Sequence, residues 1–163
     1  MHILVTGGAG YIGSHTCVDL LDSGYALTAI DNLSNSKQEA LRRVEQLTGK
    51  PVEFHQLDLL DRAGLDAVFA AKPVDAVIHF AAYKAVGESV AKPLDYYQNN
   101  VTGTINLLAA MRHHGCKNLV YSSSCTVYGE PKFVPITEEH PTAAAESPYG
   151  WTKLMTEQIM RDL

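Results

Sequence analysis

The chain has 163 residues, of which 46% are hydrophobic and 19% are charged, and its formal net charge is -5. This composition is typical of a folded globular domain and excludes an intrinsically disordered chain. The sequence has no basic stripe and no apolar run of membrane-spanning length, so it predicts no nucleic-acid partner and no membrane partner. Three widely spaced cysteines match no metal-ligand or disulfide pattern, which favours a cytoplasmic location.

Short apolar runs alternate with helical patterns along the chain. The apolar runs predict five buried strands, at His2–Val5, Ala26–Ile30, Val52–Leu57, Asp75–His79 and Asn118–Ser122. Helices are predicted at Ile12–Ser23, Lys37–Thr48, Arg62–Ala71 and Pro93–His114, and a last helix begins at Ser147 and Pro148. This rhythm predicts an α/β fold: a Rossmann-type, doubly wound parallel sheet with helices on both faces.

A glycine-rich loop follows the first predicted strand. The segment VTGGAGYIGSH contains Gly7, Gly10 and Gly13 in a G-x-x-G-x-x-G array. These glycines would permit a tight turn, the approach of a pyrophosphate, and close packing of the next helix. Glycines also serve plain turns, but Asp31 ends the second strand, where a carboxylate can bind an adenosine ribose. Since that carboxylate would repel a 2′-phosphate, the pattern predicts NAD rather than NADP as the cofactor.

Two further polar patterns also have ordinary structural explanations. Asp58 ends the third predicted strand, where it could reach an adenine amino group or could cap the next helix. The segment HHGC, His113 to Cys116, lies where a helix should end. We interpret it as a helix C-terminus with Gly115 at the stop, and we predict no metal site.

The segment Gly129–Ser147 has no periodicity, and the helix that follows it carries Tyr149 and Lys153. Residues four apart share a helix face, so a lysine ammonium could favour the phenolate of the tyrosine. Ser124 follows the fifth strand, at the sheet edge where ligands bind, and could polarise a substrate hydroxyl or carbonyl. Each feature also has an ordinary structural interpretation. Tyr149 and Lys153 could lie at the rim of an amphipathic helix, and the three serines that end at Ser124 could form a turn.

Several segments together resemble a known family. They are VTGGAGYIGSH, DNLSNS, HFAAYKAVGES, NNVTGTINLL, SSSCTVYG and SPYGWTKLM, which are spread along the chain from Val5 to Met155. They are similar to the N-terminal half of the UDP-glucose 4-epimerases, members of the extended short-chain dehydrogenase/reductase family. Family members are longer, so we expect a single NAD-binding domain over residues 1–163, truncated after the Tyr-x-x-x-Lys helix. The C-terminal strands and the substrate domain would then be absent.

The resemblance implies site residues by position. Ser124, Tyr149 and Lys153 match the catalytic set and also contact NAD in such enzymes. The other implied NAD contacts are Gly7, Gly10, Tyr11, Ile12, Gly13, Asp31, Asn32, Leu33, Ser34, Asn35, Ser36, Asp58, Leu59, Phe80, Ala81, Ala82, Tyr83, Lys84 and Asn99.

The implied reaction interconverts UDP-glucose and UDP-galactose by removal and return of a hydride at sugar C4, with little activity expected of this chain alone. A UDP-sugar is the implied partner, and the resemblance also implies a homodimer through the helices after strands four and five. A sugar-nucleotide 4,6-dehydratase is a competing interpretation, but Cys125 and Thr126 stand where those enzymes carry an Asp-Glu pair. The chain could also be a non-catalytic NAD-binding module, or a subunit that completes its site with a second chain.

Overall fold

The computed structural model describes residues 1–142 and 145–163, and a five-stranded parallel sheet organises the first part of the chain. The spatial order of the strands is β3-β2-β1-β4-β5. This arrangement confirms the predicted Rossmann-type fold, in which the chain order reverses between β1 and β4 and ligands bind beyond the carboxyl ends of the strands. The strands are β1 (His2–Thr6), β2 (Ala26–Asp31), β3 (Glu53–Gln56), β4 (Ala76–His79) and β5 (Asn118–Tyr121).

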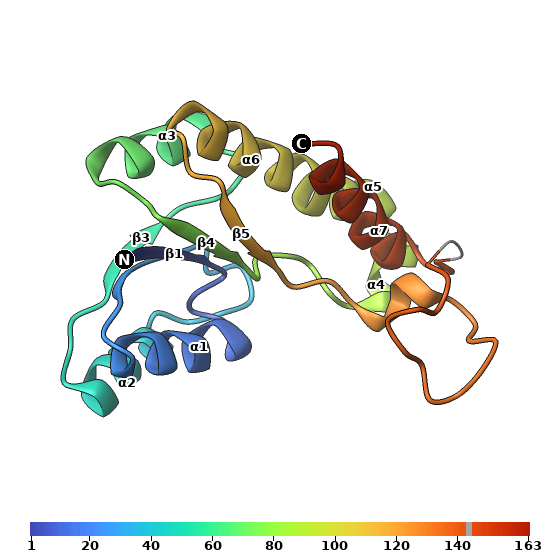
Figure 1. Ribbon diagram of the computed structural model, residues 1–163, viewed down its shortest axis with the longest axis horizontal. Coiled ribbons are helices and arrows are strands. Elements are labelled where there is room, and N and C mark those ends of the chain that lie inside the picture. Colours follow the sequence, from blue (N-terminus) through green and yellow to red (C-terminus); the bar gives the residue numbers. More distant parts are fainter. Residues whose placement is uncertain (143–144) are drawn as a thin grey trace. The chain divides into compact units, whose positions relative to one another are not determined.

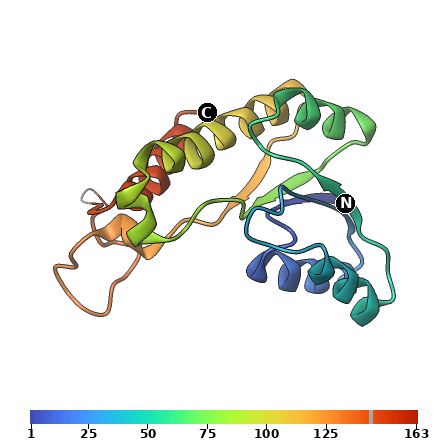
Figure 2. The same cartoon turned by 180° about the vertical axis from the view of Figure 1, so that it is seen from behind.

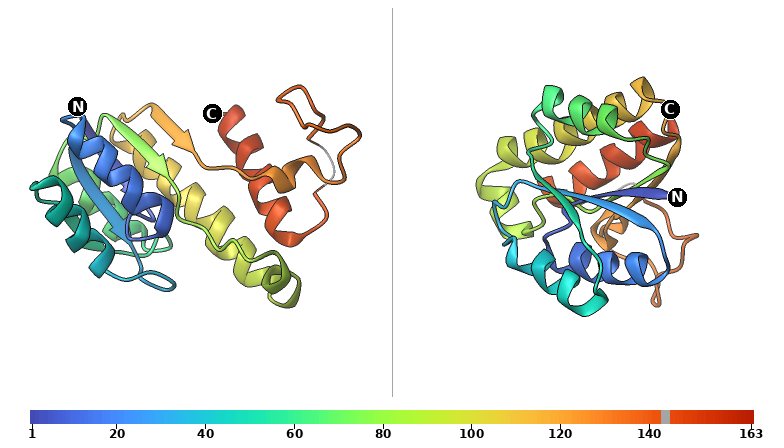
Figure 3. Two further views of the ribbon diagram at one scale, coloured as in Figure 1. Left: turned by 90° about the horizontal axis from the view of Figure 1, so that it is seen from below. Right: turned by 90° about the vertical axis from the view of Figure 1, so that its left-hand side faces the viewer.

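Helices cover both faces of this sheet (Figures 1 and 2). On one face, Val5, Ala29 and their neighbours pack with α1 (Tyr11–Asp22) and α2 (Glu39–Thr48). On the other face, Leu4 and Ile30 pack with α3 (Arg62–Ala71) and α6 (Gly103–His113). Successive side chains of a strand alternate between the faces, so continuous apolar strands supply both cores. Figure 3 shows the two helical layers from two further directions.

The chain divides into two compact units, each of which is described by itself. The first unit comprises Met1–Ala81 and Ile105–Ser122 and contains the sheet, and the second comprises Ala82–Thr104 and Ser123–Leu163. The second unit contains α4 (Val86–Ala91), α5 (Pro93–Tyr96), the π-helical segment η1 (Tyr97–Thr102), the 3-10 turn η2 (Cys125–Tyr128) and α7 (Pro148–Arg161). A single NAD-binding domain over residues 1–163 remains a prediction.

The structure corrects the predicted helix Pro93–His114, which consists of α5, η1 and α6 in succession. A π turn adds a residue to the helical repeat, so apolar spacing alone does not reveal it. The short helix α4 was not predicted either. The predicted start of α7 is confirmed, because Ser147 Oγ accepts a hydrogen bond from the amide of Gly150 at 3.1 Å.

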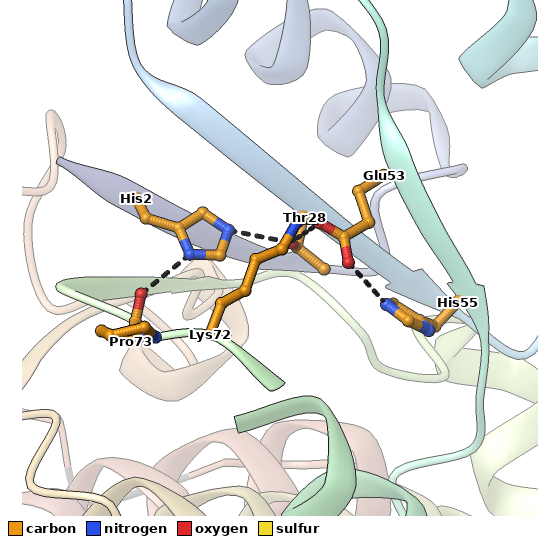
Figure 4. Close-up of polar contacts among 6 residues, drawn as sticks. All are labelled: His2, Thr28, Glu53, His55, Lys72 and Pro73. Atoms are coloured by element: carbon orange, nitrogen blue, oxygen red, sulfur yellow. Dashed lines mark hydrogen bonds and ion pairs between the residues drawn. The ribbon is translucent and has the colours of Figure 1, made fainter. Parts of the chain in front are cut away.

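A polar network lies on the first unit, near the amino ends of β1, β2 and β3 (Figure 4). His2 contacts Thr28 Oγ1 at 2.8 Å, and Thr28 donates to Glu53 at 3.3 Å. Glu53 also binds Lys72 and lies 3.2 Å from His55. Because the glycine loop follows the carboxyl end of β1, this network belongs to the opposite edge of the sheet.

None of the helices in the described part of the chain combines the length and the apolar character that a membrane span needs.

Candidate functional site

The glycine loop joins β1 to α1 in a turn that tolerates no larger residue at two positions. Gly7 has a φ of 67°, and a Cβ added there would lie 2.8 Å from the backbone nitrogen of Ala81. A Cβ on Gly13 would lie 2.2 Å from the carbonyl oxygen of Gly7. The loop therefore packs directly against the segment after β4 and against the first turn of α1.

The amino end of α1 is open to a ligand. Among the described residues no side chain caps this end, and its first turn carries no acidic residue. Its amides and the helix dipole therefore favour an anion. A Cβ on Gly10 would meet only the Gly7 oxygen, at 3.2 Å, and the Tyr11 side chain is 78% exposed. This arrangement fits the pyrophosphate of a dinucleotide.

Asp31 fixes the loops around the carboxyl end of β2. Its Oδ2 accepts from the amide of Ala9 at 3.1 Å, so it ties β2 to the glycine loop. Its Oδ1 accepts from the amide of Leu33 at 2.9 Å and from Ser36 Oγ at 2.7 Å. A carboxylate has about four acceptor positions, so capacity remains for a ribose hydroxyl. Leu33 itself adopts a φ of 59°, which is uncommon for a non-glycine residue.

Asn32 links the carboxyl ends of β2 and β3. Its Nδ2 donates to Asp58 Oδ2 at 2.9 Å, and its Oδ1 accepts from the amide of Ser34 at 3.0 Å. Asp58 Oδ1 accepts from the amide of Leu60 at 2.9 Å, so this carboxylate also orders its own loop. Of the remaining predicted contacts in this region, Asn35 is exposed and Leu59 is buried.

The segment after β4 passes from the first unit into the second, and each part is hydrogen-bonded within its own unit. In the first unit, the amide of Ala81 donates to Thr6 Oγ1 at 3.2 Å. In the second unit, the buried Asn100 accepts from the amide of Tyr83 at 2.8 Å and donates to the carbonyl of Tyr83 at 2.9 Å. Asn100 Nδ2 also lies 3.0 Å from Thr152 Oγ1 of α7. The resemblance implied the neighbouring Asn99 and gave no role to Asn100, although both are in the NNVTGT segment.

The second unit gathers the predicted catalytic residues around α7. Tyr149 and Lys153 are both buried, and the Lys153 Nζ lies 5.9 Å from the centroid of the Tyr149 ring. Burial lowers the pKa of Lys153 from 10.5 to about 8, so the side chain is mostly an ammonium at neutral pH. This arrangement places a cation beside the phenol.

Ser124 lies at the start of η2, which packs against α7 in the same unit. Its Oγ accepts from the amide of Thr126 at 3.2 Å, which orients the hydroxyl. A Cβ on Gly150 would lie 3.3 Å from the carbonyl oxygen of Thr126, so η2 contacts α7 directly beside Tyr149. Ser124, Tyr149 and Lys153 are thus carried by two elements in contact, and their catalytic roles remain predictions.

Comparisons with known proteins identify relatives along the whole chain. The UDP-glucose 4-epimerase of Bacillus subtilis is 63% identical to the chain over 163 residues, which are 100% of this chain and 48% of that protein. The human UDP-glucose 4-epimerase is 55% identical and matches 99% of the chain and 48% of its own length. The chain therefore spans about half the length of the curated relatives it matches.

Solved structures of UDP-glucose 4-epimerases also match the chain over about half of their length. The UDP-glucose 4-epimerase from Bifidobacterium longum, in complex with NAD+ and UDP, superposes with a TM-score of 0.98 at 54% identity. The match covers 99% of this chain and 48% of that one. The NAD dependent epimerase/dehydratase family matches residues 3–163. The chain therefore belongs to the NAD dependent epimerase/dehydratase family.

Proposed function

We propose that the chain is the NAD-binding half of an epimerase that interconverts UDP-glucose and UDP-galactose. One observation carries this proposal: a buried lysine lies beside a buried tyrosine on α7, next to the element that carries Ser124. A protein that only binds a dinucleotide has no need of this set. The relatives named UDP-glucose 4-epimerase supply the substrate class.

The residues of the first unit fit NAD. The uncapped start of α1 and Gly10 suit the pyrophosphate, and the carboxylate of Asp31 suits an adenosine ribose. The same carboxylate would repel the 2′-phosphate of NADP. When bound, NAD would supply the hydride acceptor and donor that the exchange at sugar C4 requires.

Within the second unit, Tyr149 would hold and move the proton of the sugar 4-hydroxyl. The phenolate accepts this proton as the C–H bond breaks and gives it back when the hydride returns, so the reaction is an isomerisation without net oxidation. The adjacent Lys153 ammonium stabilises the phenolate electrostatically. The Ser124 hydroxyl would donate to the same sugar oxygen and hold it in place.

A 4,6-dehydratase is the nearest alternative reaction. Water elimination needs a carboxylic acid after the serine of strand five, whereas this chain has Cys125 and Thr126 there. Neither side chain can serve as that acid, so the residues favour epimerisation.

The proposal also includes a substrate, an oligomeric state and a cellular compartment. A UDP-sugar is the substrate, and a second copy of the protein is the partner, bound through the helices after β4 and β5. Val90 and Leu94 supply exposed apolar side chains in this region. Cys17 and Cys116 are buried free thiols, which supports a reducing, cytoplasmic compartment.

A chimaera tests the proposed reaction. Residues 1–163 would replace the corresponding half of the Bacillus subtilis enzyme, and the product formed from UDP-galactose would be identified by chromatography. We expect UDP-glucose as the product, and a loss of about 100-fold or more in rate for Tyr149→Phe. A folded chimaera that forms a 4-keto-6-deoxy sugar would favour the dehydratase, and one that forms no product would contradict the proposal.

A further inference from the structure

Three potential metal ligands meet on the surface of the first unit, at a place that the proposed reaction does not use. Asp66 comes from α3, His113 is the last residue of α6, and His114 follows it directly. One ligand atom from each residue lies within 4.8 Å of the other two. His114 Nε2 is 2.8 Å from Asp66 Oδ1, and His113 Nε2 is 4.0 Å from the same oxygen.

The fold holds this cluster in place. The chain turns sharply after α6: Gly115 has a φ of 74°, and the amide of Cys116 donates to the carbonyl of Met111 at 2.9 Å. The His114 ring stacks on Phe69 of α3, with centroids 5.8 Å apart and an interplanar angle of 18°. His114 is therefore fixed against α3, one helical turn from Asp66.

The electrostatic setting favours a cation. The carboxyl end of a helix carries a partial negative charge. His113 ends α6 and His114 follows it, although Arg112 also lies in the last turn. Asp66 adds a full negative charge, and its side chain is 54% exposed. The His113 side chain is 72% exposed and that of His114 is 21% exposed, so an ion can reach the cluster from solvent.

The ligand chemistry selects a transition metal. Two imidazole nitrogens and a carboxylate oxygen match the donors that zinc prefers, at about 2.0–2.2 Å from the ion. Tetrahedral ligands at that distance lie about 3.3 Å apart. The 2.8 Å pair would open by about half an ångström and the 4.0 Å pair would close by somewhat more. The exposed side chains of Asp66 and His113 can make these movements while His114 stays in place.

We propose that Asp66, His113 and His114 form a binding site for a divalent transition metal ion of the zinc type. Water would complete the coordination, and the ion would tie the end of α6 to α3. This proposal departs from the sequence-based prediction of no metal site at His113–Cys116. That prediction considered only local spacing, and the third ligand, Asp66, precedes His114 by 48 residues.

Calorimetric titration of the 163-residue chain with zinc chloride tests this site. The exposed thiol of Cys125 can bind zinc by itself, so every protein carries Cys125→Ser. We expect one site whose affinity falls about 10-fold or more in both Asp66→Asn and His113→Gln. The matched control is His15→Gln, which removes an exposed histidine of α1 and should leave the affinity unchanged.

Thermal unfolding provides a second readout, and circular dichroism confirms that each variant is folded. Zinc should raise the unfolding temperature of the parent and of His15→Gln, but should raise that of the two ligand variants much less. Absence of zinc binding in the folded parent would overturn the proposal. Equal zinc affinity in the parent and in the two ligand variants would overturn it as well.

Discussion

Lys153 should destabilise the fold at neutral pH in a way that alkaline pH relieves. The side chain is 3% exposed, and its pKa falls from 10.5 to about 8 because burial disfavours the ammonium. Since one pKa unit corresponds to about 1.4 kcal/mol, the buried charge costs about 3 kcal/mol at neutral pH. Lys153→Met keeps the approximate volume of the side chain and removes the charge.

The sign of the pH dependence follows from proton binding. Between pH 8 and 10.5 the unfolded chain binds more protons at this lysine than the folded chain does, so the stability of the parent rises with pH. The methionine variant has no such ionisation. The stability of the variant relative to the parent should therefore fall by about 2 kcal/mol between about pH 7 and about pH 9.5.

Urea unfolding of both proteins across this pH range measures the difference. A loss of packing in the variant shifts the difference in stability by the same amount at every pH, so the slope reports the ionisation of Lys153. Lys117→Met, at an exposed lysine, serves as the control and should show a much smaller slope. A difference between Lys153→Met and the parent that stays constant with pH, or grows, would refute the reasoning.

Three further predictions concern packing and hydrogen bonds. Gly13→Ala should lower the free energy of unfolding by about 1–3 kcal/mol, because the added Cβ would meet the backbone oxygen of Gly7. Thermal unfolding measures the loss, and Gly87→Ala is the control, since a Cβ there would have nothing within 4 Å. Equal losses in the two variants would contradict the prediction. The hydrogen bond from Lys72 lowers the pKa of Glu53 in the folded protein. This interaction stabilises the fold fully at a pH above the pKa of Glu53 in the unfolded chain, and the stabilisation is lost as the pH falls through the pKa of Glu53 in the folded protein. Glu53→Gln should therefore flatten the acid side of a stability-against-pH curve, and an unchanged slope would count against this pairing (Figure 4). Asn100→Ala should lower the free energy of unfolding in urea by about 2–4 kcal/mol, because it leaves the backbone amide and carbonyl of Tyr83 without their buried partner. A loss below about 1 kcal/mol would contradict this and would show that water replaces the side-chain amide.

The sequence predicted the elements whose signals are local. The helix Arg62–Ala71 has the predicted bounds. β4 ends at His79 and β5 begins at Asn118, both as predicted. The glycine loop was also predictable in form, because its turn depends on residues within one short segment. The strand Val52–Leu57 is shorter in the structure, where β3 spans Glu53–Gln56. Strand ends depend on pairing with neighbours, which the sequence does not display.

The missed features depend on long-range contacts or on a change of helical register. The π-helical segment η1 interrupts the predicted helix, and within it Asn100 is buried and binds the backbone of Tyr83. The hydrogen bond that the amide of Ala9 donates to Asp31 joins residues 22 apart, and no local pattern indicates it. The roles assigned to the site residues by resemblance remain predictions, since geometry places them without showing what they bind.

Calorimetric titration of the 163-residue chain with NAD, and separately with NADP, tests the central claim most directly. The account predicts one NAD per chain, and an affinity for NADP that is lower by about 10-fold or more because of the Asp31 carboxylate. A chain that is folded by circular dichroism and binds no NAD, or binds NADP equally well, would contradict the account.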